Sequence, residues 1–524
     1  MGKYVNPGTD KFEISLNTQT YVDKSNLIAE TNALFRTEKR FVCISRPRRF
    51  GKTMAANMLS AYYGVGEEAS LLFKSLKISE HPSYEKHLNK YNVLMINMQE
   101  FLSQTKTVEA MLEMLQSSII DELIDEHQDI EYKNKTNFIQ VMYRTYQKTK
   151  RPFVILIDEW DCLFREYKND LESQKDYLDF LRLWLKDQEY VGLAYMTGIL
   201  PIKKYGSHSA LNMFEEYSMT KPRRFLEYFG FTESEVATLV AEYGVDFNEM
   251  RRWYNGYFVD LGTPLYNPKS VTSSLMDQEF SSYWNETETY EALRDYIMLN
   301  FDDLKDKIVQ MLAGNSVSIG TETFINDMTT FESADDVLTL LVHLGYLTYN
   351  FKNKTVRIPN EEIKQEFVAS IKVLKWSNVV NAINDSKKLL QAIWDLEADI
   401  VAEGVQKVHE QNTSILAYND ENSLSCVVNL ALYAATDYYT IIREMPTGKG
   451  YADLVFIPRS GHLDKPAVVI ELKWDQTVYS AISQIKERNY PSALGDYQGN
   501  ILLVGINYNK ESKKHECLVE KWTV

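Results

Sequence analysis

The chain has 524 residues, is 44% hydrophobic and 25% charged, and carries a formal net charge of −16 at pH 7. This composition is that of a globular protein, and the length exceeds what one hydrophobic core supports, so we expect about three domains. The longest apolar stretch, 424–435, is interrupted by Ser425 and Asn429 and is shorter than the roughly 20 residues of a membrane span. We therefore expect no membrane segment, and any contact with nucleic acid must come from a local patch.

Targeting and cysteine patterns favour the cytoplasm as the compartment. No apolar core follows the first basic residue, which argues against a secretion signal. The four cysteines, Cys43, Cys162, Cys426 and Cys517, are scattered and form no C-x-x-C pair. Neither a disulfide framework nor a structural zinc site is therefore expected.

Buried strands alternate with amphipathic helices in the N-terminal part of the chain. Runs of consecutive apolar residues are typical of strands that helices cover on both faces, so the alternation predicts a parallel α/β sheet. The predicted strands are 39–45, 93–98, 153–157 and 193–197, and the predicted helices between them include 53–63, 108–124 and 177–187.

The loop after the first predicted strand has the pattern of a phosphate-binding loop. Its sequence, RPRRFGKT, matches the second half of G-x-x-x-x-G-K-[ST], with Arg46 in place of the first glycine. Gly51 lets the backbone approach a phosphate, Lys52 would reach the β and γ phosphates, and the Thr53 hydroxyl would bind Mg²⁺ at a helix N-terminus. The candidate nucleotide-binding residues in this loop are Arg46, Arg48, Arg49, Gly51, Lys52 and Thr53.

A second motif follows the strand 153–157. Asp158 and Glu159 come at the carboxyl end of this strand, where ligands of open α/β sheets bind. Asp158 suits the outer sphere of the Mg²⁺ ion, and Glu159 suits the base that orients an attacking water. Alone, the two acids would indicate a helix N-cap after a strand. Together with the G-K-T loop they favour a nucleotide site.

Three further residues are candidates for the same site, each with an alternative. Thr197, at the end of the strand 193–197, can sense the γ-phosphate or can belong to an ordinary turn at Gly198. Arg223 and Arg224 can act as arginine fingers, although solvated surface arginines are the simpler interpretation.

The region 221–375 reads as short helices joined by aromatic-rich connections. A helical face begins at Asp335 and ends at Gly345, and the strand patterns 346–351 and 355–359 flank a turn. A helix followed by a hairpin predicts a winged-helix module. Such a module either binds DNA or forms a lid or a protein contact, and the second alternative is favoured because the hairpin is poor in Lys and Arg.

The last region, 376–524, contains a pair of carboxylates on neighbouring predicted strands. A helical segment, 376–408, leads to a helix, a hairpin with its turn at 459–465, and another helix. Asp453 starts one strand of the hairpin, and Glu471 and Lys473 lie on one face of the other strand because residues two apart point the same way.

Pairing of the two strands would bring Asp453 beside Glu471, and two adjacent carboxylates repel unless a cation such as Mg²⁺ lies between them. Lys473 would then position a water for attack on a phosphodiester and stabilise the developing charge. Glu421, which leads an upstream helix, is a third candidate carboxylate or a surface residue favoured by the helix dipole. Gln484 is a candidate contact on the following helix or an exposed glutamine.

Taken together, these motifs resemble a bacterial family that joins an AAA-ATPase-like domain to a C-terminal PD-(D/E)XK nuclease-like domain. The resemblance covers nearly the whole chain, and the Arg-rich loop without its first glycine is itself typical of that family. The segments that carry it are YVDKSNLI, SRPRRFGKT, VILIDEWD, WYNGY, LLVHLGYLTY, GYADLVF and VVIELKW.

The resemblance implies ATP and Mg²⁺ as cofactors and assigns roles to matching residues. Lys52, Thr53, Asp158 and Glu159 would serve the nucleotide and its magnesium, and Asp453, Glu471 and Lys473 would form the nuclease core. Two positions depart from the family pattern. Ala452 stands where the motif has Pro, and Gln484 is followed by Arg488 at the fourth position and Tyr490 at the sixth, so Q-x-x-x-Y is not reproduced.

The resulting prediction for the fold is α/β. It comprises an AAA-like P-loop NTPase domain with a parallel sheet over 1–220, a helical region with a winged-helix module over 221–375, and an α/β restriction-endonuclease-like domain over 376–524. Two functions are compatible with it: ATP-regulated, Mg²⁺-dependent cleavage of DNA or RNA, or an ATP-driven switch or scaffold whose nuclease-like domain binds nucleic acid or protein without cutting. Assembly into a homo-oligomer is compatible with either.

Overall fold

The computed structural model describes residues 2–522 except 67, 203–210, 259–260, 285–289, 300, 326–327, 375, 413–420, 447–449 and 498–499. The chain forms two compact units, Met1–Thr289 with Ser318–Ile363, and Tyr290–Val317 with Lys364–Val524. The region expected over 221–375 is thus divided between the two units, and its expected end at 375 lies outside the described residues.

A five-stranded parallel sheet in the order β2-β3-β4-β1-β5 forms the centre of the first unit. Its strands are β1 Phe41–Ser45, β2 Asn92–Asn97, β3 Phe153–Asp158, β4 Val191–Gly198 and β5 Glu215–Tyr217. The first four confirm the predicted strands, and β1, β3 and β4 are buried along their whole length. β5 was not predicted because only three residues form it.

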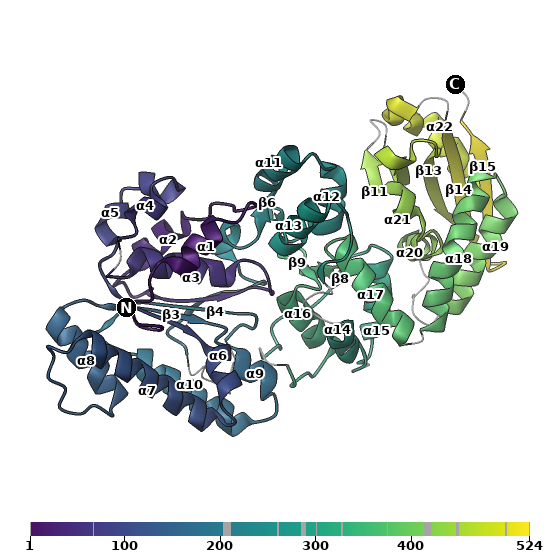
Figure 1. Ribbon diagram of the computed structural model, residues 1–524. Coiled ribbons are helices and arrows are strands. Elements are labelled where there is room, and N and C mark those ends of the chain that lie inside the picture. The colour runs from purple at the N-terminus through teal and green to yellow at the C-terminus, as the bar shows by residue number, and fades with distance from the viewer. Residues whose placement is uncertain are drawn as a thin grey trace. The chain divides into compact units, whose positions relative to one another are not determined.

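Helices cover both faces of this sheet, which explains why its strands read as continuous apolar runs. Figure 1 shows α1 Asp10–Leu16, α2 Leu27–Leu34 and α3 Lys52–Tyr63 on one face, and α7 Val108–Glu126, α8 Phe138–Thr149 and α10 Leu171–Leu185 on the other. Shorter helices are α4 Ser70–Phe73, α5 Tyr84–His87, α6 Met98–Gln104 and α9 Cys162–Glu166.

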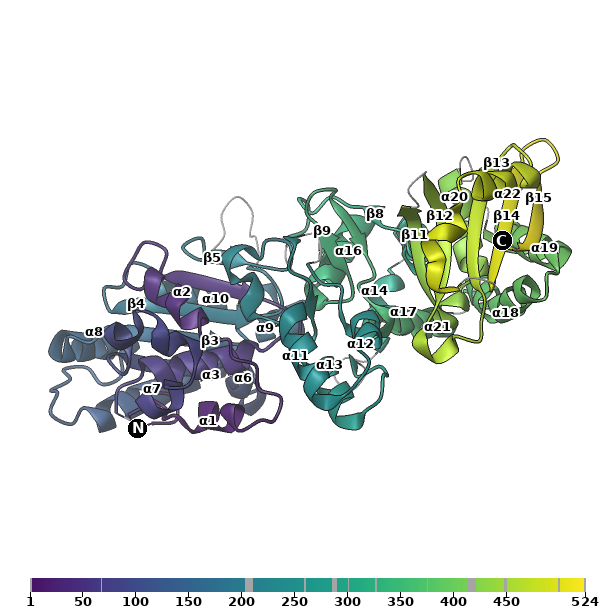
Figure 2. The same cartoon turned by 90° about the horizontal axis from the view of Figure 1, so that it is seen from above.

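Three helices that follow the sheet pack against one another (Figure 2). They are α11 Glu233–Tyr243, α12 Phe247–Tyr254 and α13 Pro268–Asp277, joined to a small antiparallel pair, β6 Phe231–Thr232 and β7 Leu265–Tyr266. The connection after α12 returns to the phosphate-binding loop, because the Tyr257 ring lies 5.3 Å from that of Phe50. This contact helps to explain why these helices belong to the first unit.

The predicted helix and hairpin are present as α16 Ala334–Leu344, β9 Thr348–Asn350 and β10 Thr355–Arg357. A capping box formed by Ser333 and Asp336 starts the helix, and Gly345 ends it at a φ of 89°, a conformation that favours glycine. That this segment is a winged-helix module stays a prediction.

A second five-stranded sheet, β11-β12-β13-β14-β15, forms the other unit and is antiparallel except for the pair β13 and β14. Its strands are β11 Tyr439–Pro446, β12 Tyr451–Pro458, β13 Ala467–Trp474, β14 Ile501–Asn509 and β15 Lys514–Lys521. Its helices are α14 Tyr290–Ile297, α15 Leu304–Leu312, α18 Ser377–Trp394, α19 Ala398–Asn412, α20 Glu421–Ala431, α21 Ala435–Tyr438 and α22 Val478–Glu487, and α17 Glu361–Val373 begins in the first unit.

The helical segment predicted over 376–408 is two helices, because Leu396 between α18 and α19 takes a φ of 63°. On the opposite side of the domain, α22 packs its residues Ile482 and Ile485 against β13 and β14. Gly505 on β14 makes this close packing possible, since a Cβ there would lie 2.9 Å from the Val478 carbonyl oxygen. Gly505 is also the β14 partner of Glu471, so α22 runs past the predicted carboxylate site.

Candidate functional site

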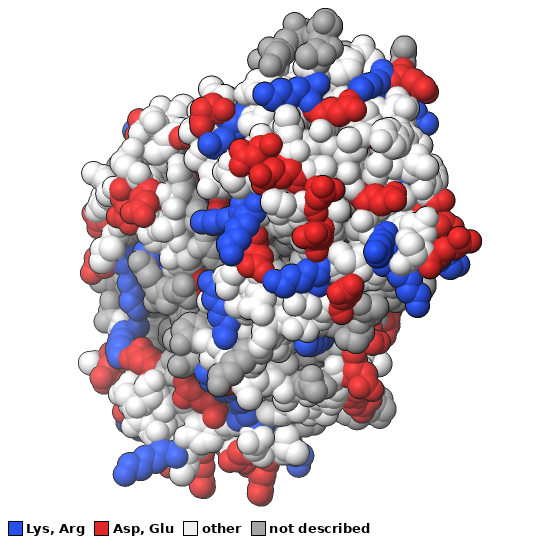
Figure 3. Space-filling view, turned by 90° about the vertical axis from the view of Figure 1, so that its right-hand side faces the viewer, with Lys and Arg blue, Asp and Glu red and all other residues white. Residues whose placement is uncertain are grey.

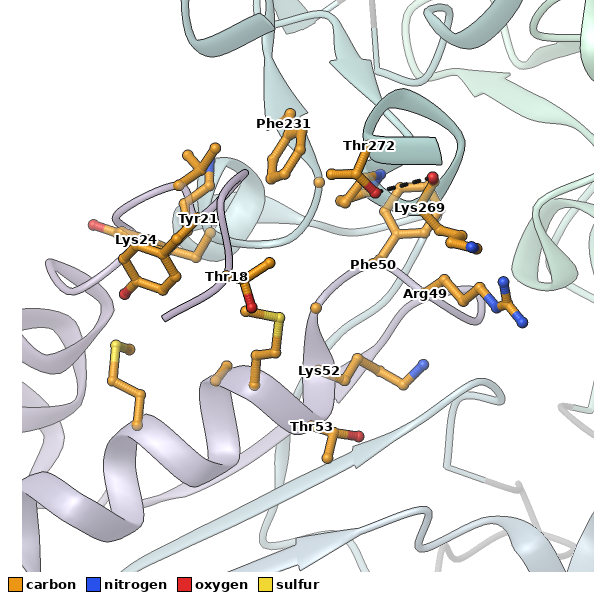
Figure 4. A pocket seen from close by; sticks show the side chains of 18 of the residues that line it. Thr18, Tyr21, Lys24, Arg49, Phe50, Lys52, Thr53, Phe231, Lys269 and Thr272 are labelled. Carbon is orange, nitrogen blue, oxygen red and sulfur yellow. Dashed lines mark hydrogen bonds between the residues drawn. The ribbon is translucent and has the colours of Figure 1, made fainter. Parts of the chain in front are cut away.

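The phosphate-binding loop opens onto a cavity of about 780 Å³ in the first unit. This volume is within the range of cofactor pockets. Figure 4 shows Arg49, Lys52 and Lys269 at one side of the cavity and Tyr21 and Thr18 at the other. We call the side with Arg49, Lys52 and Lys269 the cationic end of the cavity; Phe50 lies at this end as well, and a further lysine, Lys24, lies beside Tyr21 at the other end.

Gly51 and Lys52 form the cationic end where α3 begins. Gly51 is the residue before the helix and has a φ of 88°, which a residue with a side chain rarely adopts. The Lys52 Nζ donates hydrogen bonds to the carbonyl oxygens of Arg46 at 3.0 Å and Pro47 at 2.9 Å. Burial lowers the pKa of Lys52 although Glu159 and Asp158 act in the opposite direction. An anion at the helix N-terminus would give this desolvated ammonium a charged partner.

Thr53 and Asp158 supply oxygen atoms next to the loop. The Thr53 hydroxyl donates to the Asp158 Oδ2 at 2.6 Å, and the buried Thr197 hydroxyl donates to the Asp158 Oδ1. The three residues meet because β4, which carries Thr197, lies between the strands β1 and β3 that lead to the other two. Hydroxyl and carboxylate oxygens are the ligands that Mg²⁺ prefers, so this pair fits a nucleotide-bound magnesium ion. Thr197 itself contacts Asp158 and does not line the cavity.

Glu159, the residue after Asp158 in the sequence, lines the cavity. Its backbone has a φ of 53°, an uncommon conformation for a residue with a side chain, and its carboxylate forms an ion pair with Arg165. Burial raises the pKa of Glu159, while the charges of Lys52 and Arg165 lower it. A partly desolvated carboxylate facing the cavity has the properties of a general base.

The three arginines of the loop have different environments. Arg48 and Arg49 line the cavity, as expected of residues that contact a nucleotide. Arg46 does not: it is fully buried, donates to the carbonyl oxygens of Ser45 and Tyr217, and lies 5.6 Å from the centre of the Phe229 ring. Arg46 thus lies in the core and does not line the cavity, and its Nε and Nη2 have no hydrogen-bond partner among the described residues. A role of Arg46 in cofactor binding stays a prediction.

Other parts of the cavity were not found from the sequence. The loop before α2 contributes Thr18, Tyr21 and Val22, and the start of α13 contributes Lys269 and Thr272. Tyr21 and Val22 belong to the segment YVDKSNLI, which carried the family resemblance without an assigned role. Arg224, considered as an arginine finger, pairs with Glu30, and neither Arg223 nor Arg224 lines the cavity.

In the second unit, the hairpin of β12 and β13 brings the predicted carboxylates together. Antiparallel pairing continues to Leu454 and Ile470, and at the next position the Asp453 Oδ2 accepts a hydrogen bond from the Leu472 amide at 2.7 Å. The Lys473 Nζ lies 3.0 Å from the Glu471 Oε1. Asp453, Glu471 and Lys473 therefore form one cluster.

The cluster is electrostatically unusual because Glu471 is only 1% exposed. Its burial and the nearby Asp453 raise the pKa of Glu471 to about 7, against the opposing effect of Lys473. Burial also raises the pKa of Asp453. The Glu471 Oε2 has no hydrogen-bond partner in the described part of the chain. An unpaired buried carboxylate oxygen beside a second carboxylate fits a divalent cation.

Gln484 and Glu421 lie near this cluster in different ways. The Gln484 amide donates to the Glu471 Oε1 and, at 3.2 Å, to the Tyr490 hydroxyl. Gln484 thus has a tyrosine partner even though the Q-x-x-x-Y spacing is absent. Glu421 is exposed at the start of α20, and its charge raises the pKa of Asp453. Within the described ranges, no group of three or more His, Cys, Asp or Glu side chains is arranged to hold a metal ion.

The sheet order and the loop geometry define the first unit as a P-loop nucleotide-binding fold. Comparison with known families identifies both domains. Residues 7–207 match the family described as predicted AAA-ATPase, and residues 419–517 match the PD-(D/E)XK nuclease superfamily. The chain therefore carries an AAA-ATPase-like domain and a C-terminal domain of the PD-(D/E)XK nuclease superfamily.

Individual relatives are more distant. An uncharacterized protein in the vnfD 5′ region of Azotobacter chroococcum mcd 1 is 25% identical over 340 residues, and the match covers 61% of each chain. Among solved structures, the Aeropyrum pernix ORC2 protein in its ADPNP and ADP complexes gives a TM-score of 0.29 at 10% identity, over 70% of this chain and 93% of that one. The A. pernix ORC1 protein in complex with DNA gives a TM-score of 0.22 at 14% identity, over 70% and 97%.

Proposed function

We propose that the protein binds and hydrolyses ATP in the first unit and uses Mg²⁺ in the second to cleave a nucleic-acid phosphodiester, with the nucleotide state regulating cleavage. The substrate is DNA or RNA. The observation that carries the proposal is the cluster of the half-buried Asp453 with the buried Glu471 and Lys473, because three such groups together have little value for stability alone.

The ATPase half rests on the cavity. Gly51, Lys52 and Thr53 present backbone amides, an ammonium group and a hydroxyl to a triphosphate, and Asp158 with Thr53 would hold its magnesium ion. Glu159 would accept a proton from the attacking water, and it must first leave its ion pair with Arg165. Arg48, Arg49 and Lys269 would neutralise the phosphate charge.

In the nuclease half, Asp453 and Glu471 would hold Mg²⁺, which when bound polarises the phosphate and lowers the pKa of water. Lys473 would orient the attacking water and stabilise the charge that develops on the phosphate. The water oxygen bonds to phosphorus, one phosphorus–oxygen ester bond breaks, and the leaving oxygen takes up a proton. Gln484 would keep Glu471 in place through its hydrogen bond.

The charge distribution indicates local rather than global recognition of nucleic acid. Residues 441–524 contain 11 Lys and Arg against 10 Asp and Glu, whereas the whole chain has a charge of −16. On the face in Figure 3, basic and acidic side chains are interspersed rather than gathered into one basic field. Among the described residues, no helix is both long and apolar enough to cross a bilayer. We propose a cytoplasmic location, and assembly into a homo-oligomer stays compatible with these features.

The test is to incubate the purified full chain with Mg²⁺, ATP and mixed nucleic acids. We expect cleavage that is lost in Glu471→Ala and Lys473→Ala and retained in Lys486→Ala, whose exposed lysine pairs with Glu520. Cleavage that survives both of the first two substitutions would contradict the proposed site.

A second candidate function is an ATP-driven switch or scaffold whose nuclease-like domain binds without cutting. It is favoured by the contacts that protein groups already make to the two carboxylates: Leu472 to Asp453, and Lys473 and Gln484 to Glu471. Tight ATP binding that Lys52→Ala abolishes, combined with no hydrolysis of any nucleic acid, would favour this alternative.

A further inference from the structure

The segment WYNGY carries part of the family resemblance but has no role in the proposed reactions. Its last residue, Tyr257, is fully buried, and its ring meets that of Phe50 in the phosphate-binding loop edge to face, at 5.3 Å and 90°. The Tyr257 backbone is fixed in turn, because its amide and carbonyl groups both pair with Leu265. The Tyr257 ring therefore holds Phe50 from a fixed position.

The segment LLVHLGYLTY, which likewise has no role in the proposed reactions, contacts the same loop at Pro47. Gly345 in this segment has a φ of 89°, and a Cβ there would lie 2.8 Å from the Pro47 Cβ and Cγ. A glycine is thus required where the end of α16 approaches the proline so closely. The Tyr257 hydroxyl donates a hydrogen bond of 2.8 Å to the Gly345 carbonyl oxygen, so the two segments are also joined to each other.

The two contacts lie at either end of the part of the loop that displays its arginines. Pro47 and Phe50 are buried, whereas Arg48 between them is half-buried, Arg49 is exposed, and both arginines line the cavity. Phe50 is held a second time by the Gly230 amide, which donates to its carbonyl oxygen at 3.2 Å. Arg49 has a φ of 65°, a conformation that a residue with a side chain keeps only where its surroundings hold it. The contacts at Pro47 and Phe50 supply that support.

We propose that Tyr257 is a positioning residue for the phosphate-binding loop. Its hydroxyl bond to Gly345 closes a bridge between the two buried ends of the loop, and the two arginines between those ends are thereby presented to a triphosphate. The inference rests on the proposed binding of ATP in the first unit, to which all of these residues belong. Tyr257 is not among the described residues that line the cavity, so it acts through the loop rather than by touching the nucleotide.

The first measurement is the nucleotide affinity of the full chain with Mg²⁺, by competition with a fluorescent nucleotide. Tyr257→Phe removes only the hydroxyl and keeps the ring on Phe50. We expect it to weaken ATP binding about 5-fold, the value of one hydrogen bond, and to leave AMP binding nearly unchanged because AMP lacks the β and γ phosphates. ATP and AMP affinities that change by the same factor would overturn the proposal.

Two other buried tyrosines of the first unit are matched controls. Tyr190 donates its hydroxyl hydrogen bond to the Trp184 carbonyl oxygen at 2.6 Å, and Tyr254 donates to that of Ser281 at 2.9 Å. Tyr190→Phe and Tyr254→Phe therefore remove the same group and the same kind of bond away from the loop. Both variants should keep the wild-type ratio of ATP to AMP affinity. A loss of ATP affinity in both controls as large as in Tyr257→Phe would overturn the proposal, because general destabilisation would then explain it.

Gly345→Ala tests the bridge from its other side. The added Cβ would meet Pro47 and the Trp284 ring, so ATP affinity should fall at least as far as in Tyr257→Phe. Gly244→Ala is its control, because Gly244 also ends a helix at a positive φ, 71°, but nothing lies within 4 Å of a Cβ there. Both alanines carry the cost of a positive φ, so their difference reports on the contacts of Gly345. Equal ATP affinities of the two alanine variants would contradict the bridge.

Hydrogen exchange without nucleotide separates this inference from the proposed ATP site. Tyr257→Phe should speed exchange of the amides of residues 48–53, measured by mass spectrometry, relative to both tyrosine controls. If it does so while the wild type binds no ATP, the positioning of the loop by Tyr257 stands and the proposed ATP site fails. If the wild type binds ATP while Tyr257→Phe changes neither the exchange of the loop nor the ATP affinity, the inference fails and the proposed ATP site stands.

Discussion

At the scale of single residues, Lys52 gives the first prediction. Among the residues that the structure describes, the hydrogen bonds of its buried ammonium group go to the carbonyl oxygens of Arg46 and Pro47, and a phosphate would add charge-assisted hydrogen bonds. We expect Lys52→Ala to weaken ATP binding by about 10-fold or more, as measured by calorimetric titration with Mg²⁺. The control is Lys148→Ala, an exposed lysine on α8 outside the cavity. Equal ATP affinity of the Lys52→Ala variant and the wild type would contradict the assignment of the cavity.

Glu471 gives the second prediction, on pH. Its pKa is raised to about 7 from the usual 4.5, so near neutral pH a fraction of the carboxyl groups is protonated. Because Mg²⁺ binds the ionised form, we expect the rate of cleavage at limiting Mg²⁺ to rise with pH through about 7. Saturating Mg²⁺ should move this rise to lower pH. The pH range to cover is 5.5 to 8.5, about 1.5 units on either side of that pKa. A cleavage rate that does not change over this range at limiting Mg²⁺ would contradict the prediction.

The raised pKa of Glu471 also predicts how the stability of the protein depends on pH, and this can be measured without any nucleic acid. Because the pKa of Glu471 is raised in the folded protein, its carboxyl group ionises at lower pH in the unfolded chain than in the folded one. The contribution of Glu471 to the free energy of unfolding is therefore most favourable below pH 4.5 and is lost as the pH rises through about 7. The loss is on the order of 3 kcal/mol. In the absence of metal ions, Glu471→Gln should reduce the decline in the free energy of unfolding across this range, as measured by urea denaturation.

Individual residues also show where sequence reasoning stopped. Lys52 and Thr53 open the helix after the loop that follows β1, and Asp158 ends β3, so their convergence at one sheet edge could be predicted. The partnership of Gln484 with Tyr490 could not, because it depends on a chain reversal: α22 ends at Glu487, and Asn489 takes a φ of 53°. That turn brings Tyr490 back to Gln484 without the four-residue spacing of a single helix face.

At the scale of elements, the position of α13 determines whether Lys269 reaches the cavity. Asn267 caps the helix by accepting from the Lys269 and Ser270 amides, and Pro268 occupies the first turn. The Ser270 hydroxyl donates to the buried Glu362 carboxylate at 2.9 Å, and Glu362 also accepts from the Tyr283 amide. These contacts fix the helix terminus, and the Lys269 side chain next to it lines the cavity on the side of Arg49 (Figure 4).

The third prediction follows from this arrangement. Lys269→Ala should weaken binding of ATP more than binding of AMP, because the ammonium group lies at the cationic end with Lys52 rather than near Tyr21. The expected loss for ATP is about 10-fold, the value of one charge-assisted hydrogen bond, measured by competition with a fluorescent nucleotide. Lys269→Arg should retain most of the affinity. Equal losses for ATP and AMP would place Lys269 elsewhere along the bound nucleotide.

The strands and helices that carry a regular pattern of apolar residues could be predicted from the sequence. Those that form only because a segment distant in the sequence packs or pairs with them could not. β1, β3 and β4 are buried on both faces, so each reads as an apolar run. In contrast, β5 has three residues, two of them glutamates, and exists because β1 offers it an edge. The loop that carries Tyr21 has no periodicity, and its position at the cavity depends on packing of α1 and α2 on the sheet.

At the scale of the whole molecule, the chain has two units with separate sheets and separate cores. The two proposed sites are distributed between them, since the cavity is lined by the first unit and the carboxylate cluster belongs to the second. The number of units could not be read from chain length, because α14 and α15 join the second unit while the segment after them returns to the first.

This separation gives the fourth prediction. A ligand stabilises only the unit that binds it, by about 2.7 kcal/mol at a concentration roughly 100 times Kd. Differential scanning calorimetry should therefore show two transitions, of which Mg²⁺ with ATP raises one and leaves the other near its original temperature. Lys52→Ala should abolish that shift, and Glu471→Gln should change only the transition that ATP leaves in place. A single transition that ATP moves as a whole would mean that the two units unfold as one cooperative structure, so that nucleotide binding stabilises the carboxylate site as well.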